Sequence, residues 1–414
     1  MEPKVRLKGF CGEWISEPFS ENFSALKNNS LSRADLSDFG EVMNVHYGDV
    51  LIKFGECIDT QNDKLPFVKN IEVGKHLHNI CPLQNGDIIF ADAAEDNTVG
   101  KCCELICNDG DAIVSGLHTI AYRPKKKYAK RYLGYYLNSP YFHDQLLPHI
   151  QGTKISSISR KAVNTTSIRY PADRNEQAAL ASYFNHLDSI ISAYTSKLLS
   201  LKQVKTACLQ TMFSQEREVF PKVRFKGFEK QWKEVEFGSL LKECMDRSTF
   251  EDEDILLSSA INGVFLNTEL FGHQRGKTNI GYRKIRKNML ILSAQNLHLG
   301  NANVNLRFEH GLISPAYKIY DLINILPEFM HHWIKREETK DFFLNATTAG
   351  ASLCRKNIVW NDLYKQTLMV PEDVEEQQKI ANFFTSLDKQ IVLQSKRLEK
   401  LRHIKDACLG KLFV

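Results

Sequence analysis

The stretch Tyr170-Pro171-Ala172-Asp173-Arg174-Asn175-Glu176-Gln177 opens a segment that continues to Phe213 without proline or glycine after Pro171. Adding 200 to these numbers finds the pattern again, in register, in residues 371–413. Fifteen of the identical positions of the first copy are Pro171, Asp173, Glu176, Gln177, Phe184, Leu187, Asp188, Ile191, Leu198, Leu201, Lys205, Ala207, Cys208, Leu209 and Phe213. Such a match at one offset is an internal duplication.

Each copy carries its own helix start signal. Asp173 with Glu176, and Asp373 with Glu376, have the spacing of a capping box, and a proline lies two residues before each aspartate. We therefore expect helices that begin near residues 174 and 374. At roughly 1.5 Å per residue, each would be a rod of about 60 Å.

Apolar residues in both copies are spaced by three and four, as in a heptad seam. The seam of the two predicted helices is Phe184, Leu187, Ile191, Leu198 and Leu201 in the first copy, and Phe384, Leu387, Ile391, Leu398 and Leu401 in the second. Tyr194 and Gln394 break the seam, and Lys205 and Lys405 lie on it. We expect a two-helix coiled coil within one chain. Ordinary core helices are the alternative, but those average about 11–12 residues.

A second repeat precedes the helices. Pro3-Lys4-Val5-Arg6-Leu7-Lys8-Gly9-Phe10, followed by Trp14, returns at residues 221–228, followed by Trp232, at an offset of 218. The chain is therefore predicted to contain two copies of a unit made of an opening motif, a variable domain and a long helix. The predicted boundaries are 1–171, 172–214, 215–371 and 372–414.

The variable domains are predicted to be mixed α/β. Runs typical of strands lie at 50–54, 87–90, 112–114, 289–292 and 317–320. Helices are expected at 128–147, divided by Pro140, and at 327–344. The second domain leaves one long helix near residue 213 and enters the other near 374. Because domain termini often lie close together, we expect an antiparallel helix pair and an α+β fold with an internal pseudo-two-fold repeat.

Composition excludes several classes of protein. The net charge is only +5, so any nucleic-acid surface must be local. The ten cysteines lack the pattern of a disulfide framework and are expected to be reduced thiols. No apolar run approaches the eighteen or so residues of a membrane span. We expect a cytoplasmic protein without membrane contact.

Motifs for catalysis are not found. Residues 138–141 lack the first proline of a methyltransferase Asn/Asp-Pro-Pro-aromatic loop, and no P-loop is present. The carboxylates of residues 371–379 resemble a nuclease motif, but helix capping explains them. Cys102, Cys103 and Cys107 would need Cys81 or His118 to complete a zinc site. We expect neither a catalytic residue nor a metal in this chain.

Basic side chains cluster once in each variable domain, around Tyr128 and around Tyr282, and further ones lie on polar loops. Such groups suit phosphate contacts, although a charge run is often only a solvated face. The candidate DNA-binding residues are Arg123, Lys125, Lys126, Lys127, Lys154, Arg160, Lys161, Arg275, Lys277, Arg283, Lys284, Arg355 and Lys356.

Together these features resemble the specificity subunit of a type I restriction-modification system. The repeated openings, the Gly86-Asp87-Ile88-Ile89 segment, the loops that begin at Gly152 and Gly350, and the two Glu-Gln-x-x-(Leu/Ile)-Ala…Phe…Leu-Asp helices carry the resemblance, which covers nearly the whole chain. In the second unit Lys287-Asn288-Met289-Leu290 stands in place of Gly-Asp-Ile-Ile, which leaves the strand position there open.

The resemblance implies two target-recognition domains, each of which reads one half of a split double-stranded DNA target, and a helical spacer that fixes the gap. It also implies a non-catalytic chain with two modification subunits and with restriction subunits as partners. S-adenosylmethionine, ATP and Mg would act in those partners. The alternatives are a coiled-coil scaffold with protein-binding heads, an inactive or recombining spare copy, and a stand-alone enzyme on DNA.

Overall fold

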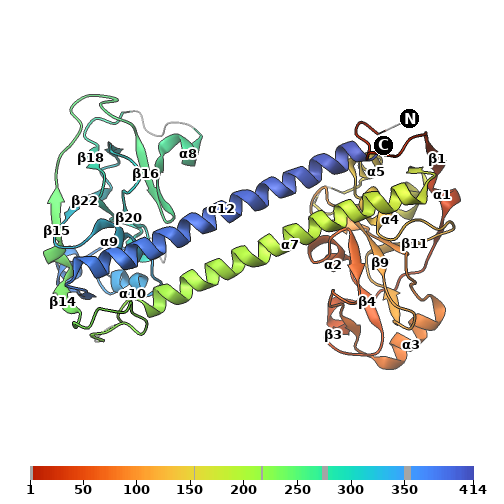
Figure 1. Ribbon diagram of the computed structural model, residues 1–414, viewed down its shortest axis with the longest axis horizontal. Helices are drawn as coiled ribbons and strands as arrows, with labels where there is room; N and C mark the ends of the chain where they lie inside the picture. The colour runs from red at the N-terminus through yellow and green to blue at the C-terminus, as the bar shows by residue number, and fades with distance from the viewer. Residues whose placement is uncertain (1–2, 153, 216–217, 273–277, 349–355) are drawn as a thin grey trace. The chain divides into compact units, whose positions relative to one another are not determined.

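The computed structural model describes residues 3–152, 154–215, 218–272, 278–348 and 356–414 (Figure 1). The chain divides into two compact units, one made of Met1–Thr195 with Lys396–Val414 and the other of Ser196–Ser395. Each unit therefore contains one variable domain and one half of each long helix. No helix in the described ranges is both long and apolar enough to cross a membrane.

The two long helices are α7, Arg174–Thr211, and α12, Val374–Leu412, which confirms the predicted starts. In the first unit Phe184 stacks on Phe413 with ring centroids 5.4 Å apart, and Asp188 Oδ1 lies 2.6 Å from Lys405 Nζ. Rising numbers on α7 meet falling numbers on α12, so the helices are antiparallel there.

The second unit repeats this arrangement with the helices exchanged. Phe213 stacks on Phe384 at 5.8 Å, and Lys205 Nζ lies 2.5 Å from Asp388 Oδ1. The predicted antiparallel pairing thus holds within each unit. The same aromatic and ionic pairs close both copies because the repeated positions include all of the residues that form them.

In each unit the opening motif joins one helix end to the other. In the first unit Val5 N donates to Lys411 O at 3.1 Å, near the end of α12, while Arg6 forms an ion pair with Glu176 at the start of α7. The second unit repeats both contacts: Val223 N donates to Thr211 O at 2.9 Å, and Arg224 pairs with Glu376. We call this arrangement the clamp.

The clamp corrects one expectation about the helix starts. Asp173 caps α7 as predicted, because its Oδ1 accepts from Asn175 N at 2.8 Å, and Asp373 does the same for α12. Glu176, however, directs both carboxylate oxygens to Arg6. The second carboxylate of the apparent capping box therefore serves tertiary structure.

The first variable domain is built on a five-stranded sheet in the order β2-β11-β7-β9-β5, beside a four-stranded sheet in the order β10-β4-β6-β3. β1 and β13 form a separate antiparallel pair. The strands of the first variable domain are β1 Trp14–Pro18, β2 Phe23–Ala25, β3 Leu36–Ser37, β4 Met43–Val45, β5 Cys57–Asp59, β6 Phe67–Val68, β7 Ile88–Ala91, β8 Ala93–Ala94, β9 Cys102–Ile106, β10 Ile113–Ser115, β11 Thr119–Pro124, β12 Ser156–Ser157 and β13 Ser167–Pro171. Its helices are α1 Phe19–Asn22, α2 Tyr47–Ile52, α3 Ile71–Ile80, α4 Tyr132–Leu137, α5 Pro140–His143 and α6 Arg160–Asn164.

The second variable domain has a four-stranded sheet in the order β15-β22-β19-β20 and three two-stranded pairs, β14-β23, β16-β17 and β18-β21. Its strands are β14 Lys233–Glu236, β15 Leu241–Cys244, β16 Leu257–Ala260, β17 Gly263–Leu266, β18 Arg283–Arg286, β19 Leu290–Ser293, β20 Ala302–Val304, β21 His310–Ile313, β22 Tyr317–Leu322 and β23 Thr367–Val370. Its helices are α8 Asn267–Phe271, α9 Pro327–Trp333, α10 Glu338–Leu344 and α11 Trp360–Lys365.

Strand register aligns the two sheets residue by residue. Ile88 of β7 pairs with Glu104 of β9, and Leu290 of β19 pairs with Val304 of β20. Ile88 and Leu290 also pair with Tyr122 and Tyr320 on their other neighbours, β11 and β22. Glu104 and Val304 therefore occupy equivalent positions.

This register settles the departure noted in the sequence. Asn288 precedes β19 as Gly86 precedes β7, and both have positive φ, 69° and 89°. Asparagine is among the few residues other than glycine that tolerate this conformation. The Gly-Asp-Ile-Ile segment therefore corresponds to Asn288-Met289-Leu290-Ile291, one residue later than the sequence comparison placed it.

Two predicted elements differ from those observed. Residues 50–54 are not a strand: α2 occupies Tyr47–Ile52, where His46 Nδ1 accepts from Gly48 N and Val50 and Phe54 share a buried face. The helix expected over 327–344 is two helices, α9 and α10. The predicted break at Pro140 is confirmed between α4 and α5.

Candidate nucleic-acid interface

The basic run after β11 lines a polar pocket of about 460 Å³ in the first unit. The other walls come from the turn before β7, from β9 and from the start of α7, and two of the residues there are Asp87 and Glu104. Of the candidate DNA-binding residues, Arg123, Lys126 and Lys127 meet here.

Two of these cations are engaged within the domain. Arg123 donates to both carboxylate oxygens of the buried Asp87, at 2.9 and 2.8 Å, and this pairing raises the pKa of the guanidinium. Lys126 Nζ lies 2.6 Å from Glu17 Oε2 and donates to Tyr170 OH at 3.1 Å. Arg123 therefore supports the sheet, and Lys126 ties the run to β1.

The remaining candidates of the first unit are accessible. Lys125 is exposed and donates to Ser20 O at 3.1 Å, while Lys127, Lys154 and Lys161 are exposed. Arg160 is half-buried and donates to Leu26 O at 2.9 Å. These side chains place positive charge on loops and on α6 of this domain.

The candidates of the second unit are placed differently. Arg275, Lys277 and Arg355 lie outside the described residues. Arg283 is only 6% exposed in β18, and its guanidinium donates to Cys244 O and Met245 Sδ, so this side chain is engaged within the domain. Lys284 forms an ion pair with Glu253, and Lys356 is half-buried.

Two cations of the pocket were not among the candidate residues. Lys130 belongs to the basic run around Tyr128, and Arg174 is the first residue of α7, 44 residues later. Nothing in the sequence links Arg174 to the run, because only tertiary folding brings the start of α7 beside the turn after β11.

Glu104 is the buried acid of the pocket. Its Oε1 accepts from Arg131 N at 2.7 Å and its Oε2 from Gly134 N at 2.9 Å. Glu104 thus provides acceptors for two backbone N–H groups at the start of α4. Burial raises the pKa of Glu104 to about 7, against the opposing effect of these N–H donors. In the second unit the equivalent position is Val304, and α9 begins with Pro327, which carries no N–H.

The spacer helices bury the predicted seam. Phe184, Leu187, Phe384, Leu387 and Leu398 are buried. Ile191, Leu198, Leu201, Ile391 and Leu401 are half-buried. Lys405 on the seam is paired: burial disfavours its charged ammonium, but Glu56 and Asp188 outweigh this effect and raise its pKa.

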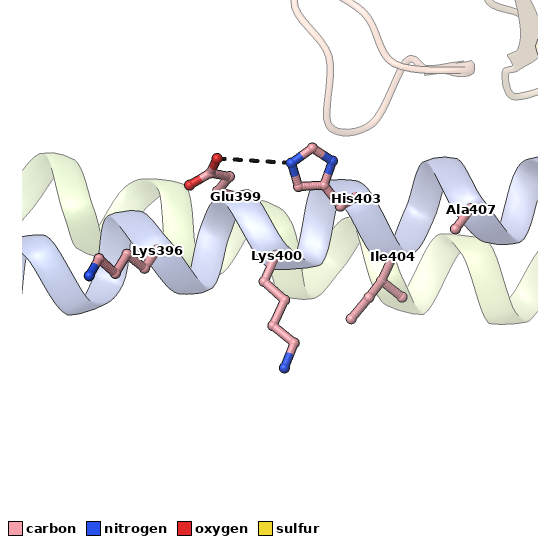
Figure 2. Close-up of a pocket in the computed structure, with 6 residues that line it drawn as sticks. All are labelled: Lys396, Glu399, Lys400, His403, Ile404 and Ala407. Atoms are coloured by element: carbon pink, nitrogen blue, oxygen red, sulfur yellow. Dashed lines mark ion pairs between the residues drawn. The ribbon is translucent and has the colours of Figure 1, made fainter. Parts of the chain in front are cut away.

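An open groove of about 330 Å³ runs along the outer face of α12 in the first unit (Figure 2). Its lining comprises Lys396, Glu399, Lys400, His403, Ile404 and Ala407. Glu399 Oε1 lies 3.9 Å from His403 Nε2 at its rim, and Ile404 is 39% exposed. Val204 and Ala207 repeat Ile404 and Ala407 on α7 in the second unit, where Val204 is 48% exposed.

No protein-family model and no curated protein matches this chain in sequence. Among solved structures, the S subunit of a type I restriction-modification system from M. genitalium is similar, with a TM-score of 0.57 and 14% identity, over 100% of this chain and 99% of that one. A structure concerned with complex assembly and conformational transition of the type I system matches with a TM-score of 0.54 and 14% identity, over 97% and 98% of the two chains. The chain has the fold of type I restriction-modification S subunits from end to end.

Proposed function

We propose that this protein is a sequence-specific DNA-binding subunit that recognises a bipartite target and directs methylation and restriction by partner subunits. The observation that carries the proposal is the duplicated scaffold on the S-subunit fold, where each unit holds a different variable domain with a clamp and a helix pairing of one design. A duplicated frame with divergent surfaces is expected if each domain reads its own half-site.

Divergence between the two domains supports separate targets. The first domain has a five-stranded sheet, a four-stranded sheet and two small pairs, whereas the second has one four-stranded sheet and three small pairs. Their cationic side chains also lie at non-equivalent positions, since the run after β11 has no lysine or arginine counterpart between Leu322 and Pro327. Phosphate contacts and base contacts would then differ from one domain to the other.

The repeated helix face supports two modification subunits as partners. The groove around Ile404 and Ala407 pairs an aliphatic floor with Lys400 and Glu399 at its edge, and Val204 and Ala207 present the corresponding positions of the second unit. Two equivalent apolar faces suit two copies of the same docking helix. Restriction subunits would join this assembly through the modification subunits or the remaining surface.

The chemistry would belong to the partners. The carboxylates at the helix starts, Glu176 and Glu376, are held by arginines, and the buried cysteines Cys102 and Cys103 have pKa values raised by burial rather than lowered for nucleophilic attack. S-adenosylmethionine, ATP and Mg are accordingly assigned to the modification and restriction subunits, with the whole complex in the cytoplasm.

Mapping of methylated adenines tests the proposal. Cells that carry the cognate modification subunit would be compared with and without this gene, and with a variant that lacks residues 215–371. A split motif should appear only with the full gene. If full-length protein and modification subunit co-purify yet no adenine motif depends on the gene, the specificity role is wrong and a protein-binding scaffold is favoured.

A further inference from the structure

The polar pocket of the first unit carries cationic charge that its own fold does not neutralise. Once the Arg123–Asp87 and Lys126–Glu17 pairs are set aside, Lys127, Lys130 and Arg174 remain on its walls.

Lys127 and Lys130 have no hydrogen-bond or ion-pair partner among the residues that the structure describes. Arg174 donates to the Tyr128 carbonyl oxygen at 3.4 Å, which is an uncharged acceptor. The three cations come from two segments of the chain, the turn after β11 and the first residue of α7.

The carboxylate oxygens of the pocket are already engaged with other donors. Both oxygens of Asp87 are taken by Arg123, and Gln84 N donates to one of them at 2.7 Å. Both oxygens of Glu104 are taken by the N–H groups of Arg131 and Gly134. A cation would find no free carboxylate here, whereas an anion would meet three donors.

The second unit shows that the shared scaffold does not require this charge. The equivalents of Glu104 and Arg174 are Val304 and Val374, and residues 322–327 read Leu-Ile-Asn-Ile-Leu-Pro in place of the basic run. The same frame therefore folds with an apolar counterpart, so the cations of the first unit are an addition to it.

We propose that this pocket is a binding site for a phosphoryl group, held by Lys127, Lys130 and Arg174. Several cationic donors that face one cavity suit a tetrahedral anion with several acceptor oxygens. A volume of about 460 Å³ admits a nucleotide-sized ligand. The phosphoryl group would belong either to a phosphodiester of duplex DNA or to a free phosphorylated molecule.

Isothermal titration of the full chain with inorganic pyrophosphate, at fixed ionic strength, tests the site. Lys127→Ala/Lys130→Ala should weaken binding at least tenfold, while Lys127→Arg/Lys130→Arg should retain it. Lys242→Ala/Lys365→Ala removes two exposed charges from the second unit and should bind like the wild type. Arg174→Gln, on a separate element, should weaken binding at least fivefold. Thermal unfolding of each variant checks that the fold is intact.

Absence of saturable pyrophosphate binding to the wild type would overturn the proposal, as would a pocket variant that binds like the control. Anisotropy with a labelled duplex then separates the two sources. Duplex binding that weakens in the pocket variant, and that pyrophosphate competes, assigns the site to a DNA phosphate. Duplex binding that is equal in both double variants, with pyrophosphate binding lost, assigns it to a small ligand. Neither result depends on the methylation map, so this inference and the proposed function fail independently.

Discussion

Glu376 is a buried carboxylate whose charge is balanced by Arg224. The side chains of both residues are largely inaccessible, at 1% and 13% exposure, and Trp232 Nε1 adds a hydrogen bond at 3.3 Å. Removal of one partner from such a pair leaves an uncompensated buried charge. The same pair in the first unit, Arg6 with Glu176, implies that each clamp depends on one arginine.

We expect Arg224→Ala to lower the free energy of unfolding of the second unit by about 3–5 kcal/mol, because Glu376 would stay buried without its cation. Urea denaturation monitored by tryptophan fluorescence measures this change. Lys389→Ala is the matched control, since Lys389 is exposed on the same helix and its replacement should change stability by less than about 0.5 kcal/mol. Equal effects of the two substitutions would contradict the role given to the clamp.

Glu104 should make stability depend on pH. Its pKa is raised by burial to about 7 from an ordinary 4.5, so the folded chain retains a proton that the unfolded chain loses between these values. Stability that Glu104 supports at low pH is therefore lost as the pH rises through this window. Relative to Glu104→Gln, the wild type should lose roughly 2–3 kcal/mol between pH 5 and pH 8. Glu95→Gln, at an exposed position, should leave the pH profile unchanged.

At the scale of elements, α9 and α4 each pack an aromatic ring on the repeated phenylalanine of a long helix, but with different residues. His332 of α9 packs on Phe384 at 5.2 Å, as Tyr135 of α4 packs on Phe184 at 5.2 Å. Tyr135 OH also donates to Asp188 Oδ2 at 2.8 Å. Burial, with a smaller contribution from Lys205, lowers the pKa of His332 to about 3.

The histidine should make the second unit acid-labile. The folded state excludes a proton that the unfolded imidazole binds below about pH 6.5, so stability falls as the pH drops from 6.5 towards 3. The wild type should lose roughly 2 kcal/mol of unfolding free energy between pH 7.5 and pH 5 through this histidine. His332→Tyr places the tyrosine of the first unit at this position and should abolish that loss. Thermal unfolding at both pH values measures this difference. A variant as acid-sensitive as the wild type would assign the effect to other groups, of which His331 is the first to test.

The seam of α12 should control assembly more than domain folding. Leu398 is 6% exposed and Leu401 is half-buried, so Leu398→Asp/Leu401→Asp places two charges in the helix interface. We expect loss of co-purification with the modification subunit and a lower unfolding temperature, while the variable domains keep their near-ultraviolet spectrum. Lys396→Asp/Lys400→Asp changes two exposed charges of the docking groove and leaves the seam intact. Comparison of the two variants therefore separates loss of helix packing from loss of the groove. Unchanged co-purification of the Leu398/Leu401 variant would count against the spacer role.

At the scale of the whole molecule, the proposed function divides the work between helices and domains. Insertion of one helical turn into both α7 and α12 should lengthen the tolerated gap between half-sites and leave the half-sites unchanged, because the domains read sequence and the helices set spacing. Methylation mapping measures both properties in one experiment. Altered half-sites with an unaltered gap would contradict this division. An insertion into α7 alone is the control and should disrupt assembly by breaking the register.

The sequence by itself determined the duplication, the helix starts at Arg174 and Val374 and the apolar seam, because these depend on local capping and on heptad spacing. It also carried the antiparallel pairing, since a compact domain between residues 213 and 374 brings its ends together. Local patterns failed at residues 50–54, where a short apolar run fits a strand or a buried helix equally well.

Only the tertiary structure decided what the charged residues do. Arg123 and Arg283 read as surface cations, but the partners that bury or neutralise them, Asp87 in one case and the sheet around β18 in the other, lie far away in sequence. Arg174 joins the polar pocket for the same reason. The partner of a charged side chain is fixed only when the chain folds, because it can come from a distant segment, whereas helix periodicity is set within a few residues.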